Sequence, residues 1–228
     1  MTNEERGSPP QWVWVGVVVA VTLALFWPAV FADFVLWDDD ITLFANPHIQ
    51  GLKAENLRWM FTDVAQTLRY KPLNWLAWAG IHEVAGLRPG AFHLANVLLH
   101  TVNAALTAGL LLSLVARACP GLARREAGWG AVIGALVWSL HPLRVEPVAW
   151  ATGLPYLLAL GFTLVSLRAY WQFACTAVDQ PHAPVGRKYW FAVGAYWLGL
   201  LSYPNILGLA TVPVAMDWWL AQKHNQAG

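Results

Sequence analysis

Residues 93–116 read HLANVLLHTVNAALTAGLLLSLVA and contain no Asp, Glu, Lys or Arg. A helix of about 24 residues is roughly 36 Å long, which is enough to cross a hydrocarbon layer of about 30 Å. This stretch therefore predicts a membrane-spanning helix. Two further apolar runs, Trp12–Ala32 and Val148–Ala174, predict spans of the same kind.

The composition excludes a water-soluble globule. Hydrophobic residues make up 57% of the 228 residues and charged residues 12%, whereas a soluble domain has about 25% charged residues. The chain has 15 tryptophans, many of them near the ends of apolar runs, and this residue prefers the boundary between membrane and water. The net charge of +1 gives no sign of a nucleic-acid-binding surface.

Three shorter apolar runs complete the bundle that we predict: Trp129–Leu140, Tyr189–Tyr203 and Ile206–Leu220. A run of about 15 residues forms a helix of only about 22 Å, which is short for a full crossing. We nevertheless expect six spans in an all-α integral membrane fold, because a bilayer leaves little alternative to helices or closed barrels.

The basic residues predict the topology. We expect a single transmembrane domain over residues 12–220, with tails at residues 1–11 and 221–228 and a long outer loop at residues 33–92. A six-span arrangement puts one group of basic residues on the side of both termini: Arg117, Arg124, Arg125, Arg168, Arg187, Lys188 and Lys223. The positive-inside rule makes that side cytoplasmic, in the inner membrane if the source is prokaryotic.

The first apolar run has a second interpretation as a signal peptide cut after Ala32. The long apolar core, and the acidic Glu4 and Glu5 in the leader, favour an uncleaved span instead.

The outer loop predicts two short amphipathic helices. Leu52–Thr62 places Leu57, Met60 and Phe61 on one face. A second helix begins at Pro72, because proline is favoured in a first turn, and ends at Gly86. We expect its tryptophans to lie on the bilayer surface.

Three adjacent carboxylates, Asp38, Asp39 and Asp40, follow the first span. They repel one another, so a fold must stabilise them with donors or cations. The group could supply a general base for a hydroxyl, or bind a divalent cation through Asp38 and Asp40. It could equally be a solvated turn that caps the next segment.

A turn with two prolines, HPLRVEP at residues 141–147, lies at the predicted outer membrane edge. The prolines discourage regular helix, so Arg144 and Glu146 should sit on irregular backbone. Arg144 could hold a phosphate, and Glu146 could accept a hydrogen bond from a sugar. The alternative is a surface ion pair between them.

The span at 93–116 carries polar residues at steps of three and four, which share one helix face: His93, Asn96, His100, Asn103 and Thr107. Such residues face the bundle interior, where hydrogen bonds between helices are their commonest role. They do not predict a metal site, because His93 and His100 are two turns apart and have no third ligand. In the outer loop, Lys71 could bind an anionic group or be a surface lysine that snorkels.

Several motifs resemble one family, in the same order along the chain. They are FVLWDDDI at 34–41, NPHIQGL at 46–52, KPLNWL at 71–76, FHLANVLLH at 92–100 and HPLRVEPVAW at 141–150. The chain resembles the N-terminal module of membrane glycosyltransferases of the GT-C fold. The pattern is most similar to the transmembrane and tetratricopeptide-repeat O-mannosyltransferases, especially their bacterial-type relatives.

The resemblance implies an inverting enzyme that moves a sugar from a polyprenyl-phosphate carrier to a hydroxyl acceptor, such as a protein Ser or Thr. It makes Asp39 the catalytic base and Asp38 its neighbour and tuner. Arg144 and Lys71 would face the carrier phosphate, and further substrate contacts would come from Asp40, His93 and Glu146.

The chain departs from this pattern in three respects. Residues 152–156, TGLPY, carry no charge where such enzymes carry acidic and basic residues, and Tyr203-Pro204 replaces a Lys-Pro pair. The chain also stops at Gly228, before the further spans and repeats of such enzymes. We therefore expect that it is not active alone and binds at least one other membrane protein. The alternative is a non-catalytic assembly subunit of a larger membrane complex.

Overall fold

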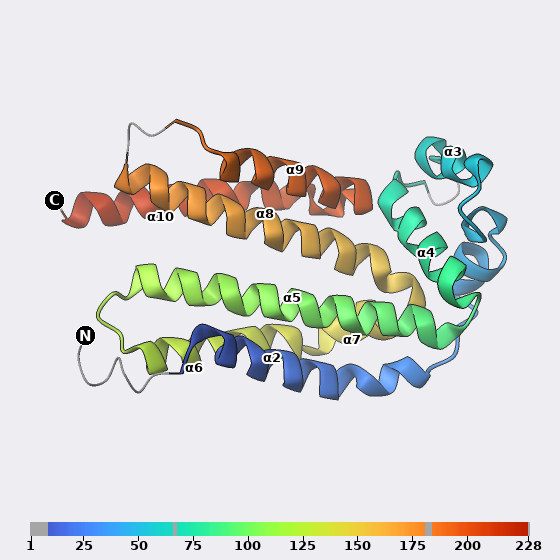
Figure 1. Ribbon diagram of the computed structural model, residues 1–228, viewed down its shortest axis with the longest axis horizontal. Helices are drawn as coiled ribbons and strands as arrows, with labels where there is room; N and C mark the ends of the chain where they lie inside the picture. The colour runs from blue at the N-terminus through green and yellow to red at the C-terminus, as the bar shows by residue number, and fades with distance from the viewer. Residues whose placement is uncertain (1–8, 66–67, 181–183, 228) are drawn as a thin grey trace.

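A computed structural model describes residues 9–65, 68–180 and 184–227 of the chain. Those residues form helices and connecting turns, with no β-strand among them. Six longer helices run side by side (Figure 1): α2 (Gln11–Phe26), α5 (Pro89–Ala118), α6 (Arg124–Ser139), α8 (Leu154–Asp179), α9 (Arg187–Ser202) and α10 (Thr211–Ala227).

Three helices in the described part are long and apolar enough to cross a membrane: Gln11–Phe31, Pro89–Ala118 and Ala151–Asp179. They correspond to the three long spans predicted from the sequence and support a location in a membrane. Helices α6, α9 and α10 contain 16, 16 and 17 residues, so a six-span topology stays a prediction.

The bundle has two layers joined by α5. Helices α2, α5 and α6 pack through Val18, Ala104 and Ala131, and Gly128 lies so close to the Trp14 ring that a side chain there would collide with it. Leu110 of α5 meets Leu164 and Trp171 of α8, with Leu220 of α10 in the same cluster. Small residues let helices approach closely, which favours packing in lipid.

The two ends of the bundle differ (Figure 1). The described N- and C-terminal residues, the α5–α6 link and the C-terminal end of α8 lie at one end, here called the inner end. The outer end carries α3 (Ala54–Thr62), α4 (Pro72–Ala85) and α7 (Val145–Ala149). The predicted basic links therefore share one end, while the side of the membrane that this end faces stays a prediction.

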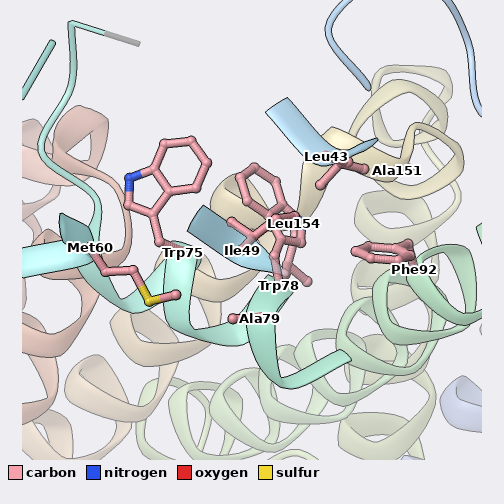
Figure 2. Close-up of a cluster of buried hydrophobic side chains, with 9 residues drawn as sticks. All are labelled: Leu43, Ile49, Met60, Trp75, Trp78, Ala79, Phe92, Ala151 and Leu154. Atoms are coloured by element: carbon pink, nitrogen blue, oxygen red, sulfur yellow. The ribbon is translucent and has the colours of Figure 1, made fainter. Parts of the chain in front are cut away.

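The outer loop has its own core (Figure 2). It joins the short π-helix η2 (Asp40–Phe44) and the 3-10 turn η3 (Pro47–Ile49) to α3 and α4, while the 3-10 turn η1 (Trp27–Phe31) precedes the loop. One cluster unites loop and bundle: Leu43, Ile49, Met60, Trp75, Trp78, Ala79, Phe92, Ala151 and Leu154.

Helix α4 has the predicted ends, since it begins at Pro72 and stops before Gly86, whose φ is +64°. Our reason for placing α4 on the bilayer was wrong, because Trp75 and Trp78 are fully buried in protein. Helix α3 begins two residues after the predicted start. Met60 is buried as expected of the apolar face, but the placement of Phe61 on that face was wrong, because Phe61 is exposed.

The turn at 141–147 is more helical than predicted. Its residues form η4 (Pro142–Arg144) and the start of α7, and η5 (Ala151–Gly153) follows. Pro142 and Pro147 lie in first turns, where no backbone N–H is needed for the helix. Gly153 packs against the Pro147 carbonyl, where a side chain would collide.

Two helix boundaries were also wrong. Because the backbone is extended at Trp150, which ends α7, the long helix runs from Leu154 to Asp179 rather than from Val148 to Ala174. The 3-10 turn η6 (Pro204–Ala210) delays the last helix to Thr211, five residues after the predicted start at Ile206.

Candidate functional site at the outer end

Two cavities lie at the outer end, and Trp150 lines both. The acidic cavity has a volume of about 410 Å³ and is lined by Ala32, Asp33, Val35, Trp37, Asp39, His93, Val145, Glu146, Ala149 and Trp150. The basic cavity has a volume of about 290 Å³ and is lined by Asp38, Ile41, Thr42, Arg69, Lys71, Trp78, Trp150, Thr152, Pro155, Tyr156 and Tyr203. The adjacent residues Asp38 and Asp39 therefore line different cavities.

Asp39 is fully buried and connects the loop to the bundle. One carboxylate oxygen accepts a hydrogen bond from the Val35 backbone N–H at 3.0 Å, and the other accepts one from the Thr152 backbone N–H at 3.1 Å. These donors offset the cost of burying the charge. Each oxygen keeps a second lone pair, so Asp39 can still accept a proton or hydrogen bond from a group in the acidic cavity.

His93 lies in the first turns of α5 and is 1% exposed. Neither ring nitrogen has a hydrogen-bond partner among the described residues. A buried imidazole without partners is costly. Because His93 also lines the acidic cavity with Asp39 and Glu146, a polar ligand there would satisfy it.

Lys71 is 7% exposed, so it is not a snorkelling surface lysine. Its ammonium lies 4.5 Å from the Trp75 ring centre and 5.0 Å from that of Trp78, and such rings attract cations. Burial, followed by repulsion from Arg69, lowers the pKa of Lys71 to about 8, while attraction to Asp38 opposes the change. The chain therefore holds a desolvated ammonium beside a cavity.

Arg69 is a second cation in the basic cavity, and no motif of the sequence singled it out. Its guanidinium donates a hydrogen bond to the Tyr203 hydroxyl and lies 5.4 Å from the centre of that ring. The rings of Tyr156 and Tyr203 meet edge to face with centres 4.9 Å apart. Proximity of Arg69 to Lys71 in the sequence was the only available signal.

The remaining predicted residues are divided. Glu146 lines the acidic cavity, but Arg144 lines neither cavity, and its guanidinium lies 5.1 Å from the Trp138 ring centre. These two described residues form no ion pair with each other. A buried oxygen of Asp40 has no partner among the described residues, which also contain no group of three or more His, Cys, Asp or Glu suited to a metal.

Three members of the polar face of α5 hold helices together. Asn96 donates to the Trp150 carbonyl at 2.7 Å, and Asn103 donates to the Leu157 carbonyl at 2.8 Å. His100 Nε2 lies 3.0 Å from the Ser139 carbonyl. Thr107 bonds within its own helix, to the Asn103 carbonyl at 2.8 Å. These contacts agree with the packing role, whereas His93 lines the acidic cavity.

This architecture defines a membrane protein with buried acidic and basic groups beside cavities at one end of its bundle. The chain is 32% identical over 161 residues to Protein O-mannosyl-transferase TMTC2 of Mus musculus, a match that covers 66% of this chain and 18% of that protein. It is 29% identical over 161 residues to TMTC2 of Homo sapiens, with the same coverage.

A match to Protein O-mannosyl-transferase TMTC3 of Mus musculus has 26% identity over 163 residues, covering 68% of this chain and 16% of that protein. The chain thus spans less than a fifth of the length of these curated relatives. No family profile and no solved structure matches. This weak homology supports a glycosyltransferase-like role.

Proposed function

We propose that the chain is a GT-C-like glycosyltransferase module that binds a polyprenyl-phosphate sugar and takes part in its transfer to a hydroxyl acceptor. The buried ammonium of Lys71 in the basic cavity carries this proposal. A desolvated cation beside two tryptophan rings favours an anionic ligand, because an anion offsets the cost of its burial. The O-mannosyl-transferase names of the relatives support the sugar chemistry.

The basic cavity would receive the phosphate of the carrier. Lys71 and Arg69 line it together. When the bond between the anomeric carbon and the phosphate oxygen breaks, negative charge develops on the leaving phosphate. Positioned cations stabilise that charge most strongly where water is excluded.

The acidic cavity would receive the acceptor. The acceptor oxygen attacks the anomeric carbon, and its proton passes to the Asp39 carboxylate. His93 and Glu146 line the same cavity and would hydrogen-bond the sugar or the acceptor. Trp150 lines both cavities, so the sugar would cross beside this side chain.

The uncharged stretches give a reason to expect a partner. Thr152, Tyr156 and Tyr203, which stand where the resembled family carries charge, all line the basic cavity. The cavity therefore has fewer charged groups than such an enzyme needs, and loss of one positioned donor typically lowers the rate by about 10²–10³. We infer that another membrane protein completes the site.

A non-catalytic assembly subunit is the second candidate, and the contacts of Asp39 favour it. One carboxylate oxygen accepts the Val35 N–H from its own segment of the loop, and the other accepts the Thr152 N–H from the bundle. An acid that fixes the loop on the bundle in this way stabilises the fold without any reaction.

Binding of a polyprenyl phosphate tests the proposal. The protein in nanodiscs should bind it with an affinity that Lys71→Gln lowers about tenfold or more, as expected for a lost charge-assisted hydrogen bond. Lys53→Gln is the matched control, because Lys53 is an exposed lysine of the same loop. Equal binding by both variants would contradict the basic cavity as the phosphate site.

Turnover separates the two candidates. Native membrane complexes that contain the chain should transfer sugar from a polyprenyl-phosphate donor to a peptide, and the isolated monomer should not. Binding without turnover in either preparation would favour the assembly subunit. Robust turnover by the monomer would contradict the need for a partner.

A further inference from the structure

The inner end contains a separate cavity of about 430 Å³ between α5, α8 and α9. Three cations line this inner cavity: Arg168 of α8, and Arg187 and Lys188 at the start of α9. Apolar side chains from all three helices, Leu106, Val165 and Phe191, line the rest with Ala169 and Gln172. None of these residues belongs to the outer cavities.

Arg168 is the unusual member, because it lies well inside a helix long enough to span a membrane. About 11 residues separate it from the inner end of α8, a distance of roughly 16 Å. Charged residues in such helices face protein or a water-filled cavity and mark ligand paths. Its guanidinium lies against Gly109 of α5, where any side chain would collide with it, so α5 leaves room for the arginine.

No acidic side chain lines the inner cavity in the described part of the chain. Two acids at this end have other partners. Asp179 accepts a hydrogen bond from Arg117 at 2.7 Å, and Asp217 accepts one from the Tyr170 hydroxyl at 2.6 Å. The three cations therefore face a cavity that offers them no counter-charge.

A hydrogen bond between α8 and α9 sets the relative depths of the residues that line the inner cavity. The Ser166 hydroxyl donates to the Ala192 carbonyl at 2.7 Å and fixes the register of α8 and α9. Because the two helices are antiparallel (Figure 1), this register brings Arg168 within about one turn of the start of α9. Val165 lies about one turn deeper in the bundle than Arg168. Phe191 lies about one turn deeper than Arg187 and Lys188, and at nearly the depth of Arg168.

From the inner end inward, Arg187 and Lys188 come first, Arg168 and Phe191 follow and Val165 lies deepest, an order that suits an anionic phospholipid. A phosphate would lie among the cations, and an acyl chain would follow the apolar residues toward the middle of the bundle. Trp190 lies in the first turn of α9, close to the cations, and is exposed. Tryptophan is typical of the membrane interface. Basic pockets between helices at a membrane surface bind anionic head groups.

We propose that the inner cavity binds an anionic phospholipid from the leaflet at the inner end, through Arg168, Arg187 and Lys188. This site is independent of the proposed transfer at the outer end. A lipid held there would bridge α5 to α8 and α9.

Native mass spectrometry of the full chain with phosphatidylglycerol and phosphatidylcholine tests the proposal. One phosphatidylglycerol should bind in preference to phosphatidylcholine, and Arg168→Gln should weaken it about tenfold or more. Arg117→Gln is the control, because this inner-end arginine already pairs with Asp179. Lys71→Gln should leave the inner lipid bound, so the two proposals fail separately.

Two further arms keep the result decisive. Arg187→Gln/Lys188→Gln changes only exposed side chains, so it should weaken the lipid even if Arg168→Gln disturbs folding. Inorganic phosphate should compete poorly, because it lacks the acyl chain. Equal losses in the Arg117 control, no preference for the anionic lipid, or full competition by inorganic phosphate would each overturn the proposal.

Discussion

The outer and inner ends of the bundle treat their charges differently. At the outer end, Asp39, Lys71 and His93 are at most 7% exposed, and a long loop with its own aromatic core covers them. At the inner end the links are short, and Arg187 and Lys188 are exposed. Burying charge is costly, so the outer end, where the chain sustains that cost, is where we place the chemistry.

The largest expected effect concerns which side of the membrane each end faces. In a variant without Cys119 and Cys175, a cysteine at Ala54 should react with an impermeant thiol reagent in intact cells, and one at Ala123 should not. The basic inner end should be cytoplasmic. Labelling of Ala123→Cys but not of Ala54→Cys would mean that the inner end faces the outside of the cell.

Asp39→Asn tests whether the buried acid is catalytic. In any preparation that transfers sugar, the variant should lose at least about 10²-fold in rate, as expected for a missing general base. It should also unfold more readily, because its amide NH₂ would face one of the two backbone donors that Asp39 now accepts.

Glu55→Gln is the control for Asp39, since Glu55 is an exposed acid of the same loop, and it should change neither rate nor melting temperature. If Asp39→Asn kept full activity but had a lower melting temperature, Asp39 would only stabilise the outer loop and would not be catalytic.

The sequence revealed the long helices but not the cavities. The three long spans follow from apolar length alone, and the limits of α4 follow from Pro72 and Gly86, which act locally. The burial of Trp75 and Trp78 did not follow, because an apolar residue that faces lipid and one that faces protein look alike in a membrane protein.

Contacts between distant segments were equally hidden. Arg69 meets Tyr203 across 134 positions, and Asp39 meets Thr152 across 113. The sequence could identify Asp39, Lys71 and His93 as candidates from their residue types, but it could not show that they are buried, which is rare for such residues. Only the fold could separate them from Arg144, which lies on Trp138.

The lowered pKa of Lys71 predicts a pH dependence that is confined to the outer end. Phosphate binding needs the charged ammonium, so affinity should fall as the pH rises through about 8. The unfolded chain holds this proton up to a pKa of 10.5. It therefore binds more protons than the folded chain between those values, and stability should rise with pH across that window.

Titration of polyprenyl-phosphate binding and melting temperature from pH 7 to pH 10 measures both effects. Lys71→Gln should remove its share of each, whereas Lys53→Gln should keep both. Binding by the unsubstituted protein that stays constant through pH 9 would mean that Lys71 does not hold the phosphate.

The smallest expected effect distinguishes two roles on the polar face of α5, helix packing by Asn103 and substrate binding by His93. Asn103 donates to the Leu157 carbonyl, so Asn103→Ala should lower the free energy of unfolding by about 0.5–1.5 kcal/mol, as for other hydrogen bonds between membrane helices.

His93 has no partner among the described residues. His93→Leu removes a buried polar group that is already unsatisfied, so it should leave stability unchanged or raised. It should weaken sugar-phosphate binding several-fold, because His93 lines the acidic cavity, whereas Asn103→Ala should not. Thermal unfolding and ligand titration of the two variants in the same nanodiscs would show the crossing pattern. If His93→Leu cost more stability than Asn103→Ala and left binding intact, His93 would be another packing residue, and the acidic cavity would lose one of its candidate contacts with substrate.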